Sequence, residues 1–317
     1  MREPIAAAMT VATAAVALLL AGGPPAGAVG TAGGCQVFPA DNHWNLRVDK
    51  LPVLKNSRDL VRSIGRGEEL HPDFGSGNFQ GAPIGIPITF VGPSQPYVPI
   101  QYTEFGDESD PGPFPIPPDA AIEGGDKSDG DRHVIVVQTG SPCMAFELYH
   151  AERPSGGSNA WKAGSGADWD LSSNAVRKAG LTSADAAGLP ILPGLARFEE
   201  VQAGSIDHAL RVTVPESRRK FIYPATHFAS DSKSRKLPAM GQRFRLKGRV
   251  DPSDFPPQAA VVVRALKTYG AIVADNGSPW FLSGAPNPGW DNDDLNDLNE
   301  LSGRDFVAVD TTKLPRP

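Results

Sequence analysis

Hydrophobic residues in this chain occur in short runs that glycine and proline separate. The clearest pair of runs is 133–138 (HVIVVQ) and 144–150 (MAFELYH), and the turn between them, which contains Gly-Ser-Pro, predicts a β-hairpin. Residues 206–214 (IDHALRVTV) alternate with a period of two, as expected of a strand with one buried face. Two more strands are predicted at 220–223 and 243–247. The pattern therefore predicts a mainly β protein.

Helical patterns are few and short. Residues 56–64 predict one helix, and residues 258–269 (QAAVVVRALKTY) predict an apolar helix that follows two prolines and stops at Gly270. The second helix is apolar enough that we expect it to pack on the sheet.

Turn residues predict two further features. Asn276-Gly277 is the strongest short hairpin signal in the chain, so residues 271–274 and 278–283 are expected to pair. The tract 106–118 is too rich in proline for a helix, and its Phe and Ile side chains favour a loop laid on the body of the protein.

The predicted fold class is an antiparallel β-sandwich or jelly roll with one or two packed helices and long Pro/Gly-rich loops. With 34 Gly and 31 Pro in 317 residues, a bundle of long helices is excluded. We expect one domain over residues 31–317. Two β subdomains with a seam near 155–166 are the alternative, because that stretch is rich in Gly and Ser.

The amino terminus and the cysteines together predict export. Arg2 is followed by an apolar run over residues 6–21 and then by small residues and prolines, which predicts a cleaved signal peptide over residues 1–30. The only cysteines are Cys35 and Cys143. In an oxidising compartment they are expected to form one disulfide, so the protein is predicted to be secreted.

Charge and motifs narrow the class of function. The formal net charge is -6 at pH 7. The sequence lacks a basic stripe interleaved with aromatic residues, so it does not predict a nucleic-acid partner. Sequence signatures of serine hydrolases, zincins and nucleotide-binding enzymes are missing. We predict no cofactor, no metal site, no membrane contact after signal cleavage, and a monomer.

Ionisable residues on the predicted hairpin are candidates for catalysis. Asp131 and His133 precede one strand, and Glu147 lies in its partner. If odd positions pair with odd positions, His133 and Glu147 share a face, where a carboxylate beside an imidazole favours acid/base chemistry. If odd positions pair with even positions, Asp131 and His133 share a face with His150, which favours a metal site. Both registers stay open at this point.

Two other segments contribute candidates. Strand alternation places Asp207 and Arg211 on one face, where they either line a cleft or form an internal ion pair, and sends His208 to the opposite face. His227 follows a predicted strand and lies in a loop, where ligand-contacting residues are often found. Two such histidines with one carboxylate would resemble the metal site of a cupin-like barrel.

Tryptophans near the carboxyl end suggest sugar binding. Trp280 and Trp290 are flanked by Asp and Asn, including Asp275, and an indole ring offers a flat apolar face on which a sugar ring stacks. The alternative is structural, with Asn276-Gly277 forming only a turn.

Three stretches resemble a known group of sequences. Residues 130–137 (GDRHVIVV), residues 206–214, and residues 274–280 with 289–294 are similar to an uncharacterised family of secreted proteins of high-GC bacteria. The likeness covers most of residues 36–310. It implies export and one compact domain, and it transfers no catalytic residue.

The sequence thus predicts a secreted glycoside hydrolase that cleaves an extracellular polysaccharide with a carboxylate acid/base pair. Two alternatives remain: a non-catalytic carbohydrate-binding β-sandwich, and a metal-dependent cupin-like enzyme or polysaccharide lyase. The predicted catalytic residues are Asp131, His133, Glu147, His208 and His227. The predicted substrate contacts are Arg211, Asp207, Asp275, Trp280 and Trp290.

Overall fold

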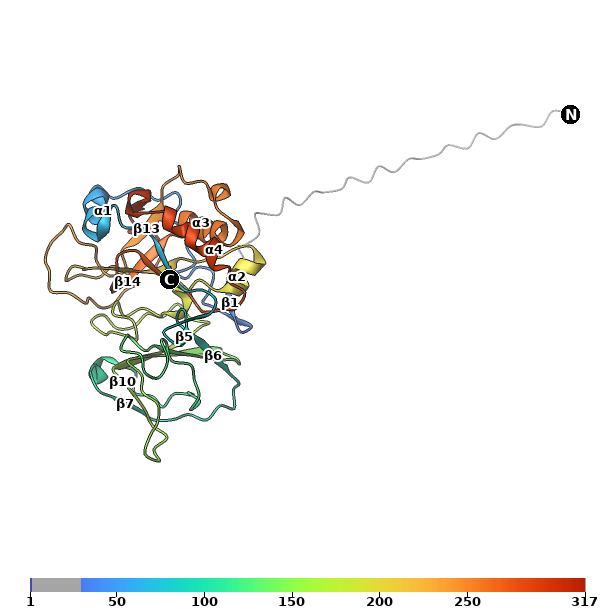
Figure 1. Ribbon diagram of the computed structural model, residues 1–317, viewed down its shortest axis with the longest axis vertical. Helices are drawn as coiled ribbons and strands as arrows, with labels where there is room; N and C mark the ends of the chain where they lie inside the picture. Colours follow the sequence, from blue (N-terminus) through green and yellow to red (C-terminus); the bar gives the residue numbers. More distant parts are fainter. Residues whose placement is uncertain (2–29, 317) are drawn as a thin grey trace.

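The computed structural model describes Met1 and residues 30–316 (Figure 1). The predicted signal peptide, residues 1–30, lies outside the described residues except at its two ends. No helix in the described part of the chain is long and apolar enough to cross a bilayer.

A mixed six-stranded sheet forms the larger half of the protein. Its strand order is β16-β13-β14-β12-β15-β3, with β12 parallel to β14 and β15 parallel to β3. The strands are β3 (His71–Asp73), β12 (Leu210–Val214), β13 (Arg243–Leu246), β14 (Ala271–Asn276), β15 (Phe281–Ser283) and β16 (Phe306–Ala308).

A second, four-stranded sheet has the order β11-β9-β8-β6. Its strands are β6 (Ile88–Val91), β8 (Val134–Gln138), β9 (Met144–Tyr149) and β11 (Ser165–Asp170). The predicted hairpin is confirmed as β8–β9, and Ile135 pairs with Glu147. Three small pairs complete the strands of the described residues: β1 (Thr31–Ala32) with β2 (Cys35–Gln36), β4 (Asn78–Phe79) with β5 (Ala82–Pro83), and β7 (Ile100–Tyr102) with β10 (Trp161–Ala163).

Helices are short and lie mostly against the larger sheet (Figure 1). The predicted helices are confirmed as α1 (Ser57–Gly65) and α3 (Pro257–Thr268), and α3 buries Val262 and Leu266 completely. The others are α2 (Phe198–Ala203) and α4 (Asn292–Asn296). The 3-10 turns are η1 (Gly106–Glu108), η2 (Leu192–Gly194), η3 (Pro252–Asp254), η4 (Asp297–Glu300) and η5 (Gly303–Asp305).

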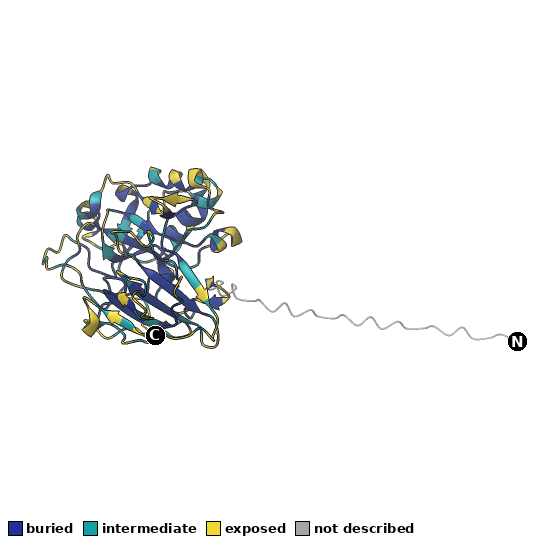
Figure 2. Ribbon diagram, turned by 60° about the horizontal axis from the view of Figure 1, so that its bottom comes forward, coloured by how far each residue is buried: buried dark blue, intermediate teal, exposed yellow. Residues whose placement is uncertain are grey.

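Strand β8 is buried on both of its faces, and this joins the two halves of the protein. Ile135 and Val137 pack into the main core, which the larger sheet shares, while Val134 and Val136 pack into a second apolar cluster. Phe114 of the proline-rich tract is buried in that second cluster, as the sequence predicted for a loop laid on the body. Figure 2 shows the central strands as the buried part of the molecule.

Two features of the predicted fold are corrected. The fold is β-rich with few helices, but four strand pairs are parallel rather than antiparallel. Strands β14 and β15 do not form the hairpin that Asn276-Gly277 indicated, because β12 lies between them in the sheet. Residues 277–280 therefore cross from one side of β12 to the other instead of closing a tight turn. Residues 220–223 contribute only an isolated bridge, from Phe221 to Met240.

The predicted disulfide is confirmed. Cys35 and Cys143 are joined, which ties the amino-terminal segment to the β8–β9 turn across a sequence separation of 108 residues. Cys35 is 2% exposed. A cross-link over so long a loop restricts the unfolded chain strongly.

Removing this cross-link tests its contribution. We expect the Cys35→Ala/Cys143→Ala variant to lose about 2–4 kcal/mol of unfolding free energy, because its unfolded chain regains the freedom that the closed loop removes. Urea denaturation of both proteins, each with and without reductant, measures the loss. Reductant should weaken the wild type and leave the variant unchanged; a variant as stable as the oxidised wild type would contradict the assignment.

Candidate functional site

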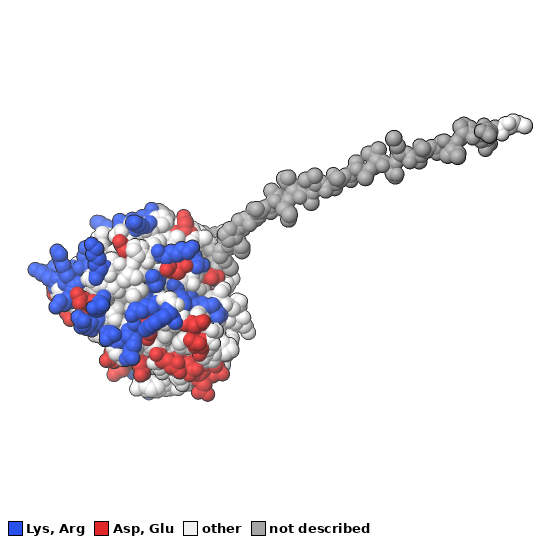
Figure 3. Space-filling model, turned by 90° about the horizontal axis from the view of Figure 1, so that it is seen from above, with Lys and Arg blue, Asp and Glu red and all other residues white. Residues whose placement is uncertain are grey.

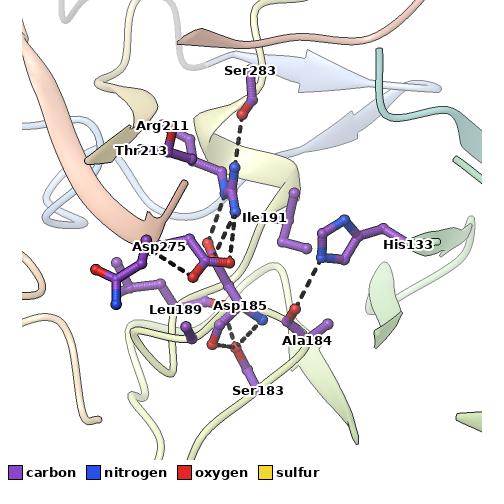
Figure 4. Close-up of polar contacts among 12 residues, drawn as sticks. His133, Ser183, Ala184, Asp185, Leu189, Ile191, Arg211, Thr213, Asp275 and Ser283 are labelled. Atoms are coloured by element: carbon purple, nitrogen blue, oxygen red, sulfur yellow. Dashed lines mark hydrogen bonds and ion pairs between the residues drawn. The ribbon is translucent and has the colours of Figure 1, made fainter. Parts of the chain in front are cut away.

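A buried cluster of charged side chains lies where the two sheets meet. At its centre is Arg211 of β12, which is 3% exposed. Its Nε and Nη2 atoms each donate to one oxygen of Asp185 at 2.9 Å, and its Nη1 atom donates to Ser283 Oγ at 2.8 Å (Figure 4). We call Glu123, His133, Asp185, Arg211 and Asp275 the Arg211 cluster.

The loop that carries Asp185 is fixed by its own hydrogen bonds. Ser183 Oγ accepts from the Asp185 amide at 2.9 Å and donates to the Leu189 carbonyl at 2.6 Å. Gly188 has φ +68° there, and a Cβ atom would lie 2.1 Å from Thr226 Oγ1, so only glycine fits. The buried carboxylate is thereby held facing the guanidinium.

Asp275 is the least compensated member of the cluster. It lies near the end of β14, and its Oδ2 atom is 3.5 Å from Arg211 Nη2, farther than either Asp185 contact. Burial, and then repulsion by Asp185, raise the pKa of Asp275 to about 7 against the opposing attraction of Arg211. The side chain remains 19% exposed. Asp275 is therefore a carboxylic acid that keeps its proton up to nearly neutral pH.

His133 is held as a cation. Its Nδ1 atom is 2.6 Å from Glu123 Oε2, and its Nε2 atom is 3.1 Å from the Ala184 carbonyl oxygen. Both partners accept hydrogen bonds, so both ring nitrogens donate. Burial lowers the pKa of His133, but the charge and hydrogen bond of Glu123 outweigh it and raise the pKa to about 9. This histidine is thus a fixed positive charge rather than a general base.

Glu147 anchors the loop from inside the protein. The residue is fully buried on β9, and its carboxylate accepts from the amides of Ile191 and Leu192 at 2.9–3.0 Å. Burial is the main cause that raises the pKa of Glu147 to about 7. Its hydrogen bonds position the loop that presents Asp185.

The register of the β8–β9 pair decides between the odd–odd and the odd–even pairing considered from the sequence. Ile135 pairs with Glu147, so odd positions pair with odd positions, and His133 and Glu147 share a face. His150 belongs to another environment, where its Nδ1 atom lies 2.7 Å from Glu104. Among the described residues, no group of three or more His, Cys, Asp or Glu is placed to hold a metal ion.

A pocket of about 590 Å³ opens beside the cluster, and we call it the Asp275 pocket. It brings together three of the predicted residues from separate segments, Asp131, His227 and Asp275. The remaining lining is mainly hydroxyl groups and aromatic rings. The polar and aromatic lining residues include Phe105, Tyr149, Ser165, Thr182, Ser183, Phe228, Ser230, Asp231 and Asn276.

His227 stands at the wall of this pocket. Its Nδ1–H group donates to the Ala186 carbonyl at 2.9 Å, and its Nε2 atom lies 3.6 Å from Glu108 Oε2. The ring stacks on Phe228 with a centroid separation of 5.4 Å. One ring nitrogen is therefore committed to the backbone and the other faces a carboxylate.

The predicted pair of Asp131 and Glu147 does not meet. Asp131 is exposed and lines the pocket, whereas Glu147 has no exposed surface and is absent from the pocket lining. The physical reason is that Glu147 sits where the backbone amides of the neighbouring loop need an acceptor.

His208 and Asp207 also lie away from the pocket. His208 is buried with Glu200, at 3.1 Å from its Nε2 atom, and with Arg197. Asp207 is half-buried and accepts a hydrogen bond from Ser205. The ion pair considered between Asp207 and Arg211 does not form, because Arg211 pairs with Asp185 instead.

Both tryptophans are core residues. Trp280 is fully buried, stacks on Phe306 at a centroid distance of 4.8 Å, and donates to the Gly65 carbonyl. Trp290 is 3% exposed and donates to the Ala285 carbonyl. The expectation of exposed stacking platforms is therefore corrected, because each indole has its apolar faces and its N–H group satisfied inside the protein.

Sequence reasoning missed Asp185, Ser183 and Tyr149. Asp185 lies in an irregular loop, where no periodicity indicates which side chains are buried.

Comparison with protein-family models, with curated proteins and with solved structures found no match. The geometry of the pocket and of the Arg211 cluster therefore carries the functional argument.

The role of Glu147 can be tested by a near-isosteric change. We expect Glu147→Gln to lower the unfolding free energy by about 1–3 kcal/mol, because the amide offers one acceptor oxygen where the carboxylate offers two, and the Ile191 amide bonds to both. Chemical denaturation measures the loss. An unchanged stability would contradict an anchoring role.

The charge on His133 predicts a pH dependence. Its pKa of about 9 exceeds the unfolded value of 6.5. The contribution of His133 to the unfolding free energy is therefore complete below pH 6.5 and is lost as the pH rises through 9. Unfolding free energy should fall by about 3 kcal/mol in total across this window. The pKa values of Glu147 and Asp275 are about 7, so His133 dominates the upper part of the window. Denaturation curves measured at several pH values test this, and a slope equally steep in His133→Gln would disprove the assignment.

Proposed function

We propose that the chain is an exported glycoside hydrolase whose substrate binds in the Asp275 pocket. The observation that carries this proposal is that one pocket is lined by two carboxyl groups in unlike environments: Asp275, whose pKa burial raises to about 7, and the exposed Asp131. Two carboxyl groups in unlike environments are what glycosidic bond cleavage needs.

Asp275 is suited to act as the general acid. The leaving oxygen of a glycosidic bond must be protonated as the bond breaks, and an acid with a pKa near 7 is still about half protonated at neutral pH. Arg211 lowers the pKa of Asp275 but does not outweigh burial and Asp185, because its shorter hydrogen bonds, at 2.9 Å, go to Asp185 and its contact with Asp275 is 3.5 Å.

Asp131 supplies the second carboxylate. It is exposed in the pocket wall, and its negative charge is one of the causes that raise the pKa of Asp275. A solvated carboxylate can activate a water molecule or attack the sugar carbon directly. The revised pair is therefore Asp131 with Asp275, and Glu147 becomes a positioning residue.

The rest of the pocket is suited to sugar recognition. The rings of Tyr149 and Phe228 offer apolar faces, and the half-buried polar side chains of Ser230 and Asn276 lie in the same lining. Sugar rings need both, because their C–H faces stack on aromatic rings while their hydroxyls form hydrogen bonds. A volume of about 590 Å³ is in the usual range for ligand pockets.

Export and architecture belong to the same proposal. The apolar run at 6–21 and the Cys35–Cys143 disulfide support secretion. Two sheets that bury a common apolar cluster support a sandwich-like architecture.

Hydrolysis of a panel of plant, fungal and bacterial polysaccharides tests the function. On any cleaved glycan we expect Asp275→Asn and Asp131→Asn each to lower kcat roughly 10²–10⁴-fold. The wild-type rate should fall above pH 7 as Asp275 loses its proton. Asp231→Asn is the matched control, because Asp231 lines the same pocket with a 93% exposed side chain, and it should keep most of the activity.

Two outcomes would contradict the proposal. Equal losses in all three variants would show that the pair has no special role. Glycan binding without any product would instead favour the non-catalytic carbohydrate-binding alternative.

A further inference from the structure

Lysine and arginine are unevenly distributed in this acidic protein. Residues 216–249 contain ten Lys and Arg against two Asp and Glu, and residues 55–66 contain four against one, although the whole chain has a net charge of -6. Of these fourteen basic residues only Arg243 is fully buried. The positive charge therefore lies on the surface.

The two basic segments lie side by side. Asn56 Nδ2 donates to the Arg235 carbonyl at 3.4 Å, and Arg58 and Arg66 of the α1 region are close enough to Lys247 to lower its pKa, after burial and Arg249. Figure 3 shows Lys and Arg side chains gathered on one face of the molecule. We call this surface the basic face and define it as the Lys and Arg side chains of residues 55–66 and 216–249, apart from the buried Arg243.

Few carboxylates neutralise the basic face. Among the described residues, the ion pairs in its two segments are Arg62 with Asp59, Arg219 with Asp231 and Arg249 with Asp305. The pKa of Arg218 is lowered by burial and then by Arg235, as expected where like charges gather. Such a face attracts an extended anion.

The basic face borders the Asp275 pocket. The Arg219 guanidinium lies 5.3 Å from the Phe228 ring centroid, and its Nη1 atom is 3.7 Å from Asp231. Phe228 and Asp231 both line the pocket. The pocket itself contains three aspartates, Asp131, Asp231 and Asp275, so a neutral group is favoured inside it and anionic groups outside it.

We propose that the substrate is an acidic polysaccharide, whose charged sugar units bind the basic face while a neutral unit occupies the Asp275 pocket. This inference rests on the proposed function and specifies its substrate class. Single-stranded nucleic acid is disfavoured as the occupant because stacking of its bases needs exposed rings. The exposed large aromatic residues, Phe79, Phe90, Tyr97 and Phe105, belong to neither basic segment.

Binding can be measured without turnover. The mature Asp275→Asn protein is titrated with hyaluronan fragments, in which charged and neutral units alternate, with neutral dextran, and with single-stranded DNA of equal charge. We expect hyaluronan to bind, dextran to bind more weakly, and the hyaluronan Kd to rise when salt increases from about 20 mM to about 200 mM. Calorimetry or fluorescence anisotropy gives the Kd.

A charge-reversal pair locates the surface. Arg235→Glu/Lys236→Glu should weaken hyaluronan binding roughly tenfold or more, because both side chains are exposed on the basic face. Lys162→Glu/Lys178→Glu makes the same charge change outside the two basic segments, also at exposed residues, and should leave the Kd within about twofold.

Each remaining outcome is decisive. Equal effects of the two double variants, no preference for hyaluronan over dextran, or tighter binding of the DNA would overturn the inference. Cleavage of a neutral glycan with no affinity for hyaluronan would overturn it while the proposed function stands. Hyaluronan binding at the basic face with no cleavage of any glycan would refute the hydrolase and keep the surface assignment.

Discussion

The buried ion pair between Arg211 and Asp185 is the interaction on which the site depends. Neither side chain is more than 4% exposed, and the contact is bidentate with both distances 2.9 Å. Breaking such a pair leaves an uncompensated charge in the core, which is strongly unfavourable. The pair therefore fixes the loop of Asp185 against β12, and with it the wall of the Asp275 pocket.

The same pair determines the charge state of its neighbours. Because Arg211 is committed to Asp185, it gives Asp275 only a 3.5 Å contact, and burial with repulsion by Asp185 raises the pKa of Asp275 to about 7. On the other side of the loop, Glu123 and His133 form a second pair, with the pKa of the acid lowered and that of the base raised. Internal ion pairs thus surround one carboxyl group, Asp275, whose pKa is raised to about 7 and whose side chain remains 19% exposed, and this contrast supports a catalytic rather than a structural interpretation of Asp275.

Local features of the fold could be predicted from the sequence, and long-range ones could not. Runs of apolar residues were enough to predict β8–β9 and α3, since each depends on neighbours in the chain. The Asn276-Gly277 signal failed because β12, about sixty residues earlier in the chain, inserts between β14 and β15. For the same reason Asp131, His227 and Asp275 were identified singly, while their grouping, and the burial of Glu147 and Trp280, required the tertiary structure.

The central claim is that Asp275 titrates near pH 7, so that a large fraction of its side chains is protonated at neutral pH. It is tested most directly by NMR titration of the ¹³C-labelled side-chain carboxyl groups, with the Asp275 signal assigned from the Asp275→Asn spectrum. The account predicts a midpoint near 7 for that signal, well above the 3.8 of an ordinary aspartate. A midpoint at or below about 4 would show that Arg211 compensates both carboxylates, and the proposed acid would not exist.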